Sequence, residues 1–310
     1  MKLADMQILI TGGTGFLGTN LYYALLKYGV PKENIELVGS QADLRIKDNC
    51  IFYMKDKDIV LHLAANIGGI GKHITQPADI VYDNLIMNAN VIDAATKCNI
   101  KKLILAGTAC SYPANASIPL KEIDIWNGNP AKETAPYGWA KRMMMVQANS
   151  YREQYGLNAI TLIPTNIYGK YDHFGKNAHV IPALIKKVSD AKANNAEEIS
   201  IWGDGSATRE FIYAEDVAKA FIMATERYDK PKPINIGTGI EIHIENLVYM
   251  LCKLIGYEGK IRWDVSMPNG SQRRQLDISE AYKEFGFRAT TNLEAGLKET
   301  IDWYMHSEKP

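Results

Sequence analysis

Residues 8–18 read Ile8-Leu9-Ile10-Thr11-Gly12-Gly13-Thr14-Gly15-Phe16-Leu17-Gly18, an apolar run that leads through a glycine-rich turn into a helical pattern. Gly13, Gly15 and Gly18 satisfy the spacing G-x-G-x-x-G, whose missing side chains let the backbone approach a pyrophosphate. The helix that follows offers free N–H groups and the positive end of its dipole to that anion. A glycine-rich turn without a ligand is the alternative, but its position at the first strand-to-helix junction favours a dinucleotide site. The predicted contacts here are Gly12, Gly13, Thr14, Gly15, Phe16, Leu17 and Gly18.

Short runs of Val, Ile and Leu alternate with longer helical patterns through the first two thirds of the chain. The runs lack period-two alternation, which is typical of strands that helices cover on both faces. Glycines at 29 and 156 are expected to stop two of the helices. The alternation predicts an α/β fold with a doubly wound parallel sheet of the Rossmann type. The predicted strands are 7–11, 35–39, 59–63, 102–106 and 159–164, and the predicted helices are 16–28, 77–98 and 137–155.

From about residue 180 the pattern becomes mixed, with a helix near 180–193 and a polar break at 194–198 before short strands and helices. We therefore expect a dinucleotide-binding Rossmann domain at 1–170 and a smaller mixed α/β region that binds the substrate at 171–310. Some crossing of the chain between the two is expected. No Pro- and Ser-rich linker separates the parts, so we expect them to share one cleft.

Composition argues against several classes of protein. The 310 residues include 35 Lys and Arg and 35 Asp and Glu, so bulk charge does not favour binding to nucleic acid or to an anionic membrane. The four cysteines, Cys50, Cys98, Cys110 and Cys252, lie far apart, so neither a disulfide framework nor a metal site is predicted. No secretory or membrane-spanning apolar stretch is found, and we expect a soluble cytoplasmic protein.

The segment after the second predicted strand bears on the choice of cofactor. An acidic residue that binds the ribose 2′-hydroxyl of NAD is usual at this place, but the chain reads Gly39-Ser40-Gln41, with Arg45 slightly further on. Without a carboxylate, a 2′-phosphate is not repelled, so the sequence favours NADP, with NADPH as the hydride donor. Ser40, Asp43 and Leu44 are predicted cofactor contacts, and an exposed loop carboxylate is the equal alternative for Asp43.

A tyrosine and a lysine stand four residues apart, at Tyr137 and Lys141, near the start of a predicted helix. Residues at this spacing share a helix face, and a nearby ammonium lowers the pKa of a phenol by about one to three units. The phenol then comes into range for exchanging a proton with a sugar carbonyl. Thr108 follows the predicted strand 102–106, where its hydroxyl is placed to hydrogen bond the same oxygen. The alternatives are a packed surface pair for Tyr137 and Lys141, and a capping residue for Thr108.

Three further stretches carry a more specific pattern. They are Gly107-Thr108-Ala109-Cys110-Ser111-Tyr112-Pro113, His179-Val180-Ile181-Pro182-Ala183-Leu184, and Ile201-Trp202-Gly203-Asp204-Gly205 followed by Arg209-Glu210-Phe211-Ile212-Tyr213. With 66–70, 164–169 and 268–271, they make the whole chain resemble the GDP-L-fucose synthase family of extended short-chain dehydrogenases/reductases. The resemblance implies an NADPH-dependent 3,5-epimerisation and 4-reduction of GDP-4-keto-6-deoxy-D-mannose to GDP-L-fucose.

The resemblance also implies roles for single residues. Cys110 and His179 would be the acid–base pair that inverts C3 and C5, although a lone cysteine after a strand is usually a small core residue and a lone histidine before an apolar helix is usually a cap. Lys187 stands where arginine is frequent, and Asn269 where aspartate is common. Family members are homodimers that pair through helices matching 77–98 and 137–155. The implied cofactor contacts are Ala106, Gly107, Lys141, Pro164, Asn166, Ile167 and His179, and the implied GDP contacts are Lys187, Trp202, Arg209 and Asn269.

Other functions of the same fold remain open at this point. A UDP-sugar 4-epimerase retains its NAD and needs no acid–base pair at C3 and C5, and a 4,6-dehydratase commonly has acidic residues where this chain has Ala109 and Cys110. The same chemistry on another GDP-4-keto-deoxysugar, such as a GDP-6-deoxy-heptose, is compatible with the same residues. A non-catalytic regulator that senses dinucleotides typically lacks the tyrosine or the lysine, and both are present here.

Overall fold

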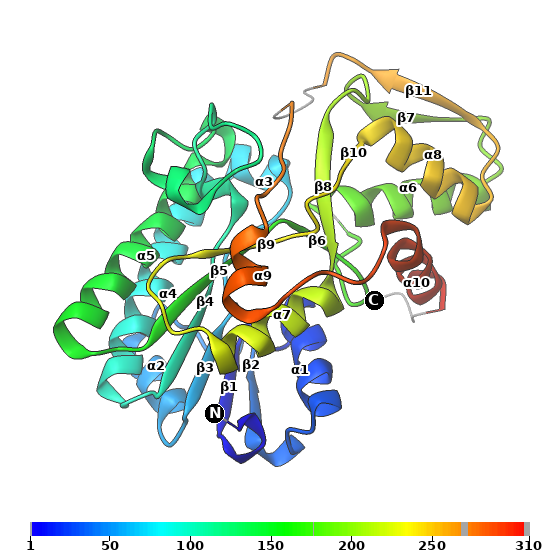
Figure 1. Cartoon of the computed structure of the whole chain (residues 1–310). Helices are drawn as coiled ribbons and strands as arrows, with labels where there is room; N and C mark the ends of the chain where they lie inside the picture. Colours follow the sequence, from blue (N-terminus) through cyan, green and yellow to red (C-terminus); the bar gives the residue numbers. More distant parts are fainter. Residues whose placement is uncertain (1, 176, 268–271, 307–310) are drawn as a thin grey trace.

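A six-stranded parallel sheet forms the centre of the larger part of the molecule (Figure 1). The computed structural model describes residues 2–175, 177–267 and 272–306. The strand order is β2-β1-β3-β4-β5-β9, so the order reverses between β1 and β3, beside the glycine turn. Sheets of this kind bind ligands at such a switch point. The strands are β1 (Ile8–Thr11), β2 (Ile35–Val38), β3 (Ile59–His62), β4 (Lys102–Ala106), β5 (Ala159–Pro164) and β9 (Ile234–Ile236).

Alternate residues along a strand of this sheet pack into two different cores. In β1, Ile8 and Ile10 belong to the core on one face, and Leu9 belongs to the core on the other. Both faces are therefore buried, which explains why the apolar runs show no period-two alternation and confirms the predicted doubly wound sheet. One face is covered by α1 (Phe16–Tyr28), α7 (Ala214–Arg227) and α9 (Ser279–Phe285), and the other by α2 (Lys47–Met54), α4 (Pro77–Lys97) and α5 (Ala135–Tyr155).

The helix ends follow the glycine signals. Gly29 caps α1 with φ 98° and Gly156 caps α5 with φ 74°, a left-handed conformation that glycine adopts without steric cost. Helix α5 begins at Ala135, two residues earlier than predicted, with Pro136 in its first turn. The helices α2 and α3 (Ile70–Thr75) were not predicted, because both are short and neither shows a long helical pattern.

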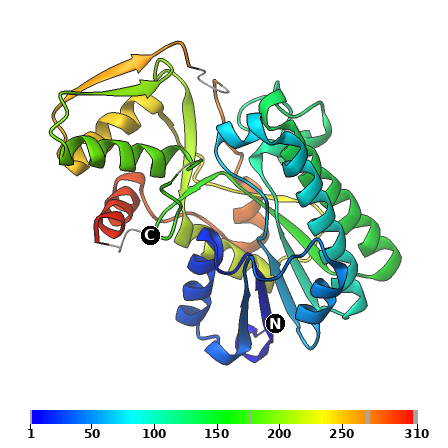
Figure 2. The ribbon, with the colours of Figure 1, turned by 180° about the vertical axis from the view of Figure 1, so that it is seen from behind.

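The smaller part has its own core and two small sheets, with strand orders β10-β8-β6 and β11-β7. Residues such as Ile185, Leu251 and Ile301 pack together in that core. In both views of the ribbon, this part lies on the opposite side of the molecule from α4 and α5 (Figures 1 and 2). Its elements are β6 (Asn166–Tyr168), α6 (Val180–Ala193), β7 (Glu198–Trp202), β8 (Thr208–Tyr213), β10 (Glu241–His243), α8 (Ile244–Ile255), β11 (Lys260–Asp264) and α10 (Leu293–His306).

Segments from the second half of the chain return to the large sheet. Strand β9 pairs with the edge of β5, with Leu162 opposite Ile234. Phe221 on α7 and Phe285 on α9 are buried in the same core as Ile8. The chain thus crosses between the two parts repeatedly. Among the described residues, no helix combines the length and the apolar character that crossing a bilayer requires.

Candidate active site

The glycine turn after β1 is shaped by close contacts that only glycine permits. Gly12 has φ +68°, and a Cβ atom on it would lie 2.7 Å from the backbone nitrogen of Ala64. A Cβ on Gly18 would lie 2.3 Å from the carbonyl oxygen of Gly12. Helix α1 begins at Phe16, directly after the turn, so its first N–H groups face the space that the missing side chains leave. This cradle fits the phosphates of a dinucleotide.

Replacing Gly18 by alanine is expected to weaken the binding of NADPH by about tenfold or more, equivalent to at least about 1.4 kcal/mol. The added methyl group would lie 2.3 Å from the carbonyl oxygen of Gly12, so the turn has to move. Titration of NADPH fluorescence measures the affinity. Gly71→Ala is the control, because the nearest atom to its Cβ would be the side-chain oxygen of Asn177 at 3.8 Å. Equal affinities for Gly18→Ala and the wild type would contradict the assignment.

A cleft of about 830 Å³ opens beside this turn. Its walls come from segments that follow β1, β2, β3 and β6, which lie apart in the sequence. The loops on two of its sides touch, because the N–H of Gly69 donates to the carbonyl of Asn177 at 2.8 Å. The volume is ordinary for a site that holds a cofactor. The predicted contacts that line this cleft are Gly12, Thr14, Gly15, Phe16, Leu17, Gly18, Ser40, Asp43, Leu44 and His179.

The other predicted cofactor contacts do not line this cleft. Gly13 is packed beneath the turn, where its N–H donates to the carbonyl of Val38 at 2.9 Å. The remainder lie at the end of β4 or directly after it, at the end of β5, on β6, or on α5. These residues are Ala106, Gly107, Lys141, Pro164, Asn166 and Ile167.

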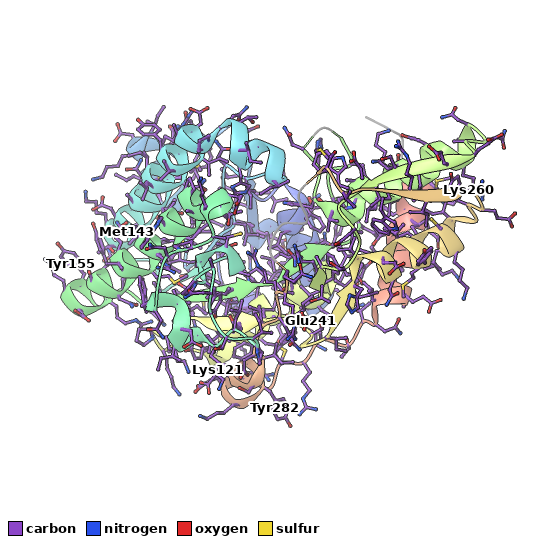
Figure 3. All side chains as sticks on the ribbon, turned by 90° about the horizontal axis from the view of Figure 1, so that it is seen from above. Lys121, Met143, Tyr155, Glu241, Lys260 and Tyr282 are labelled. Carbon is purple, nitrogen blue, oxygen red and sulfur yellow. The ribbon has the colours of Figure 1, made fainter. Side chains whose placement is uncertain are left out.

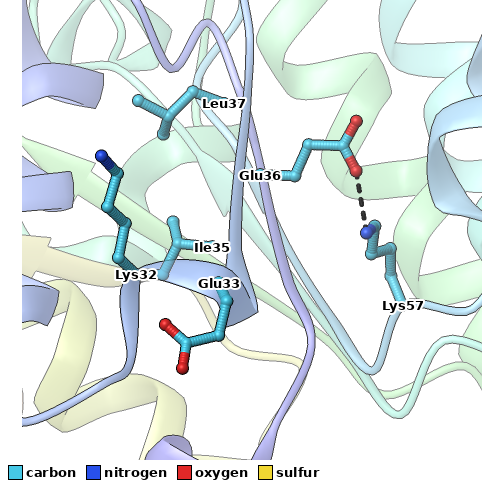
Figure 4. Close-up of a pocket in the computed structure, with 6 residues that line it drawn as sticks. All are labelled: Lys32, Glu33, Ile35, Glu36, Leu37 and Lys57. Atoms are coloured by element: carbon cyan, nitrogen blue, oxygen red, sulfur yellow. Dashed lines mark ion pairs between the residues drawn. The ribbon is translucent and has the colours of Figure 1, made fainter.

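A second pocket, of about 580 Å³, lies against β2 at the edge of the large sheet (Figure 4). It is lined by residues such as Lys32, Glu33 and Leu37, and Lys57 pairs with Glu36 at 2.8 Å on its other side. None of the predicted site residues that the structure describes lines it. It has no part in the candidate active site.

The segment after β2 carries an ion-pair network at the end of the cleft. The guanidinium of Arg45 contacts the carboxylate of Asp43 at 2.8 Å and that of Asp83 at 2.9 Å. The hydrogen bond from Arg45 lowers the pKa of Asp43. Asp83 also accepts a hydrogen bond from the side chain of Asn66 at 2.8 Å. Asp43 is therefore a paired carboxylate on the wall of the cleft.

Tyr137 and Lys141 lie on the first turns of α5, and both are almost fully buried. Nζ of Lys141 lies 5.7 Å from the centre of the Tyr137 ring. Burial raises the pKa of the Tyr137 phenol, and the thiol of Cys110 adds to the rise. The pKa of this phenol is therefore raised, and not lowered as the sequence predicts, with burial as the main cause. Burial also lowers the pKa of Lys141 to about 8.

Thr108 and Cys110 meet the start of α5 directly after β4. The hydroxyl oxygen of Thr108 accepts a hydrogen bond from the N–H of Cys110 at 3.2 Å, so Thr108 does cap a short turn, but its O–H remains able to donate. Gly138 packs so tightly here that a Cβ on it would lie 2.4 Å from the carbonyl oxygen of Cys110. This close packing fixes the thiol-bearing residue next to Tyr137. Nη1 of Arg274 lies 3.7 Å from Sγ of Cys110.

His179 is the capping residue of α6, and its side chain is 46% exposed. Its Nδ1 lies 3.9 Å from a carboxylate oxygen of Asp172, a buried residue. His73, on α3, connects this region to the tyrosine: its ring centre lies 5.9 Å from that of Tyr137 in an edge-on arrangement. Burial lowers the pKa of His73, and the electrostatic effect of the neighbouring His179 and Lys72 lowers it further.

The residues expected to hold GDP lie on the smaller part. Nζ of Lys187 donates to the carbonyl of Ser200 at 2.7 Å, so this ammonium binds β7 in the structure described here. Trp202, at the end of β7, is half exposed. Arg209 lies on β8, and burial together with the charge of Arg274 lowers its pKa to about 10. Asn269 lies outside the described residues.

Sequence reasoning did not find three residues of this region, namely His73, Asp172 and Arg274. None belongs to a glycine turn, and none stands at a fixed spacing from Tyr137 that would mark it. Only folding brings them to the carboxyl edge of the sheet. Within the described ranges, no group of three His, Cys, Asp or Glu side chains is arranged to hold a metal ion.

Comparisons with known proteins show what this chain is similar to. The profile described as the NAD dependent epimerase/dehydratase family matches residues 8–237. The chain is 39% identical over 312 residues to a GDP-L-fucose synthase from Sinorhizobium fredii (strain NBRC 101917 / NGR234), with 98% of each chain covered.

Among solved structures, the chain is similar to a GDP-6-OMe-4-keto-L-xylo-heptose reductase from C. jejuni, with a TM-score of 0.91 at 29% identity over 98% of this chain and 99% of that one. It is also similar to a GDP-mannoheptose C4 reductase from Campylobacter jejuni with NADP bound, with a TM-score of 0.88 at 29% identity and the same coverage.

Proposed function

Because the chain belongs to the NAD dependent epimerase/dehydratase family, we propose that it converts GDP-4-keto-6-deoxy-D-mannose into GDP-L-fucose by 3,5-epimerisation and NADPH-dependent 4-reduction. The full-length relative described as GDP-L-fucose synthase supports the chemistry and the substrate class. The observation that carries the proposal is Cys110, whose backbone packs against Gly138 at the start of α5 and whose thiol lies 3.7 Å from Nη1 of Arg274. A plain reductase needs the tyrosine and the lysine but no such thiol.

The epimerisation would use Cys110 and His179 as the acid–base pair. The hydrogens on C3 and C5 of a 4-ketosugar are acidified by the carbonyl between them. One side chain removes such a proton, and the electron pair moves to the ketone oxygen to give an enolate; the other returns a proton to the opposite face. Tyr137 and Thr108 would donate hydrogen bonds to that oxygen, which would stabilise the developing charge.

The reduction would use Tyr137 as the proton donor. The residues of the glycine turn would hold NADPH, which supplies a hydride for C4 when it is bound. A phenol whose pKa burial has raised keeps its proton at neutral pH, and so it is ready to protonate the alkoxide that forms on the C4 oxygen. Lys141, with a pKa of about 8, is still mostly charged at pH 7 and favours the phenolate that remains.

The preference for NADP over NAD rests on the segment after β2. No carboxylate stands at Gly39-Ser40-Gln41, and Asp43 is paired with Arg45. The similar reductase with NADP bound supports the same choice.

A second candidate substrate is another GDP-4-keto-deoxysugar, such as a GDP-6-deoxy-heptose. The similarity to the C. jejuni GDP-heptose reductase over nearly the whole chain favours it. The protein would then carry out the same steps on a sugar with a longer side chain.

Incubation of the protein with NADPH and each 4-keto GDP-sugar, followed by NMR of the product, tests the proposal. GDP-L-fucose, with one NADPH consumed per sugar, is the expected result. A faster reaction with the heptose would favour the second candidate. No oxidation of NADPH with either sugar would contradict both.

We also propose a homodimer that pairs through α4 and α5. These two helices pack side by side and present large apolar residues to solvent, including Tyr82, Trp139, Met143 and Val146, which are 41–61% exposed. Met143 and Tyr155 lie along the outer side of the molecule (Figure 3). Apolar residues gathered on one face are typical of an interface between protein chains.

Met143→Glu is expected to convert the dimer to a monomer, because a charge in the centre of an apolar interface is desolvated without a partner. Size-exclusion chromatography with light scattering measures the mass. Tyr249→Glu, on α8, is the control, since Tyr249 is 51% exposed and lies outside the proposed interface. A monomeric wild type, or a dimer in both variants, would contradict the interface.

A further inference from the structure

Arg274 reaches the sulfur of Cys110 from a distant segment of the chain. Its Nη1 lies 3.7 Å from Sγ. A guanidinium stays protonated over the working pH range of enzymes and carries several N–H donors in a fixed plane. The contact therefore brings a permanent positive charge to the atom that the proposed function uses as a base.

The backbone around Arg274 is fixed from two sides. The N–H of Glu210, a fully buried residue on β8, donates to the carbonyl of Arg274 at 3.2 Å. A carboxylate oxygen of Glu210 accepts the N–H of Leu276 at 2.7 Å. On the other side, the N–H of Leu120 donates to the carbonyl of Gln275 at 2.8 Å. The guanidinium is thus presented to Cys110 from a rigid support.

We propose that Arg274 is a positioning residue that holds the sulfur of Cys110 as a thiolate directed at the sugar. The proposal rests on the proposed function, in which this sulfur takes a proton from carbon. In that step the S–H bond forms, the C–H bond breaks, and its electron pair moves to the ketone oxygen. Hydrogen bonds from a cation stabilise a thiolate and fix its direction before the step begins.

Other charged groups surround this contact. The charge of Arg274 lowers the pKa of Arg209 on β8, and Cys110 raises the pKa of Tyr137 on α5. Arg273, the neighbour of Arg274 in the chain, instead pairs with the carboxylate of Glu241. Arg273 is therefore a matched control for the loss of one positive charge.

The test measures how fast Cys110 reacts with iodoacetamide as a function of pH, followed by mass spectrometry of its peptide, in the full-length protein without ligands. Arg274→Gln is expected to slow the reaction at pH 7 by about tenfold and to move its rise to higher pH. Arg274→Lys, which keeps the charge, should retain most of the wild-type rate, and Arg273→Gln should match the wild type. Identical profiles for Arg274→Gln and the wild type would overturn the proposal, as would an equal loss in Arg273→Gln.

A second measurement separates this proposal from the proposed function. Exchange of solvent deuterium into C3 of the 4-keto GDP-sugar should fall by about tenfold in kcat for Arg274→Gln, and Arg274→Lys should restore it. If the wild type exchanges no deuterium, the proposed function fails, whatever the alkylation profile shows. If the wild type exchanges deuterium and Arg274→Gln exchanges it equally fast, only the role of Arg274 is overturned.

Discussion

Tyr137→Phe is expected to reduce the rate of NADPH oxidation by about 10²–10⁴-fold, the usual contribution of a positioned proton donor. The substitution removes one hydroxyl group and leaves the ring in its buried place, so α5 and the affinity for NADPH should be unchanged. The alkoxide that forms on the C4 oxygen then has no acid in contact with it. Absorbance of NADPH in the presence of the 4-keto GDP-sugar follows the reaction directly.

Tyr151→Phe is the matched control for this variant. Tyr151 lies on the same helix, but its hydroxyl group donates to Asp93 on α4 at 3.2 Å, away from Cys110 and Thr108. This control should reduce the sugar at the wild-type rate. Wild-type reduction by Tyr137→Phe would mean that another group supplies the proton.

Cys110→Ser is expected to stop the exchange of solvent deuterium into C3 and C5, again by about 10²–10⁴-fold. A serine hydroxyl is a far weaker acid than a thiol and does not ionise near neutral pH, so it cannot act as the base. The backbone N–H of residue 110, which donates to Thr108, is retained, and the fold should not change. NMR of the sugar in D₂O measures both positions.

Cys98→Ser is the control for the thiol, because Cys98 is also partly buried and its sulfur donates to a backbone carbonyl, that of Ile51, at 3.8 Å, far from Tyr137 in the fold. Exchange at the wild-type rate in Cys110→Ser would remove the thiol from the mechanism and leave a plain reductase. The two active-site variants should also differ from each other: Tyr137→Phe continues to exchange deuterium, although more slowly, whereas Cys110→Ser does not.

Local sequence signals predicted the centre of the fold. The glycine turn and the uninterrupted apolar runs predicted five of the strands of the large sheet. Buried parallel strands and helix starts have residue patterns that can be recognised within a few consecutive residues. The stops at Gly29 and Gly156 were also predictable, since a left-handed cap favours glycine.

Strand β9 and helices α7 and α9 were harder to assign to that sheet. Strand β9 has three residues, too few for a pattern, and it is recognisable only through its pairing with β5. Helix α7 shows an apolar face, but that face does not say which sheet it covers. The position of such elements is decided by tertiary packing, which a single sequence does not contain.

The residues of the candidate site also fall into those that local sequence predicts and those that depend on tertiary packing. Tyr137 and Lys141 were predictable because four residues make about one turn of a helix. The shift in the pKa of Tyr137 was not, because it depends on burial by residues such as His73 that come from elsewhere in the chain. Arg274 gave no signal at all, since its contact with Cys110 spans 164 residues.

Strand β9 is synthesised about 70 residues after β5, its partner in the large sheet. Until Ile236 has left the ribosome, the outer edge of β5 has no partner, and α7 and α9 do not yet cover their face of the sheet. Translation at about 5–20 residues per second leaves that edge open for several seconds, and unpaired strand edges attract other chains. Nascent chains of this protein should therefore depend on chaperones until the last quarter of synthesis, and a fragment that ends near residue 170 should aggregate rather than fold.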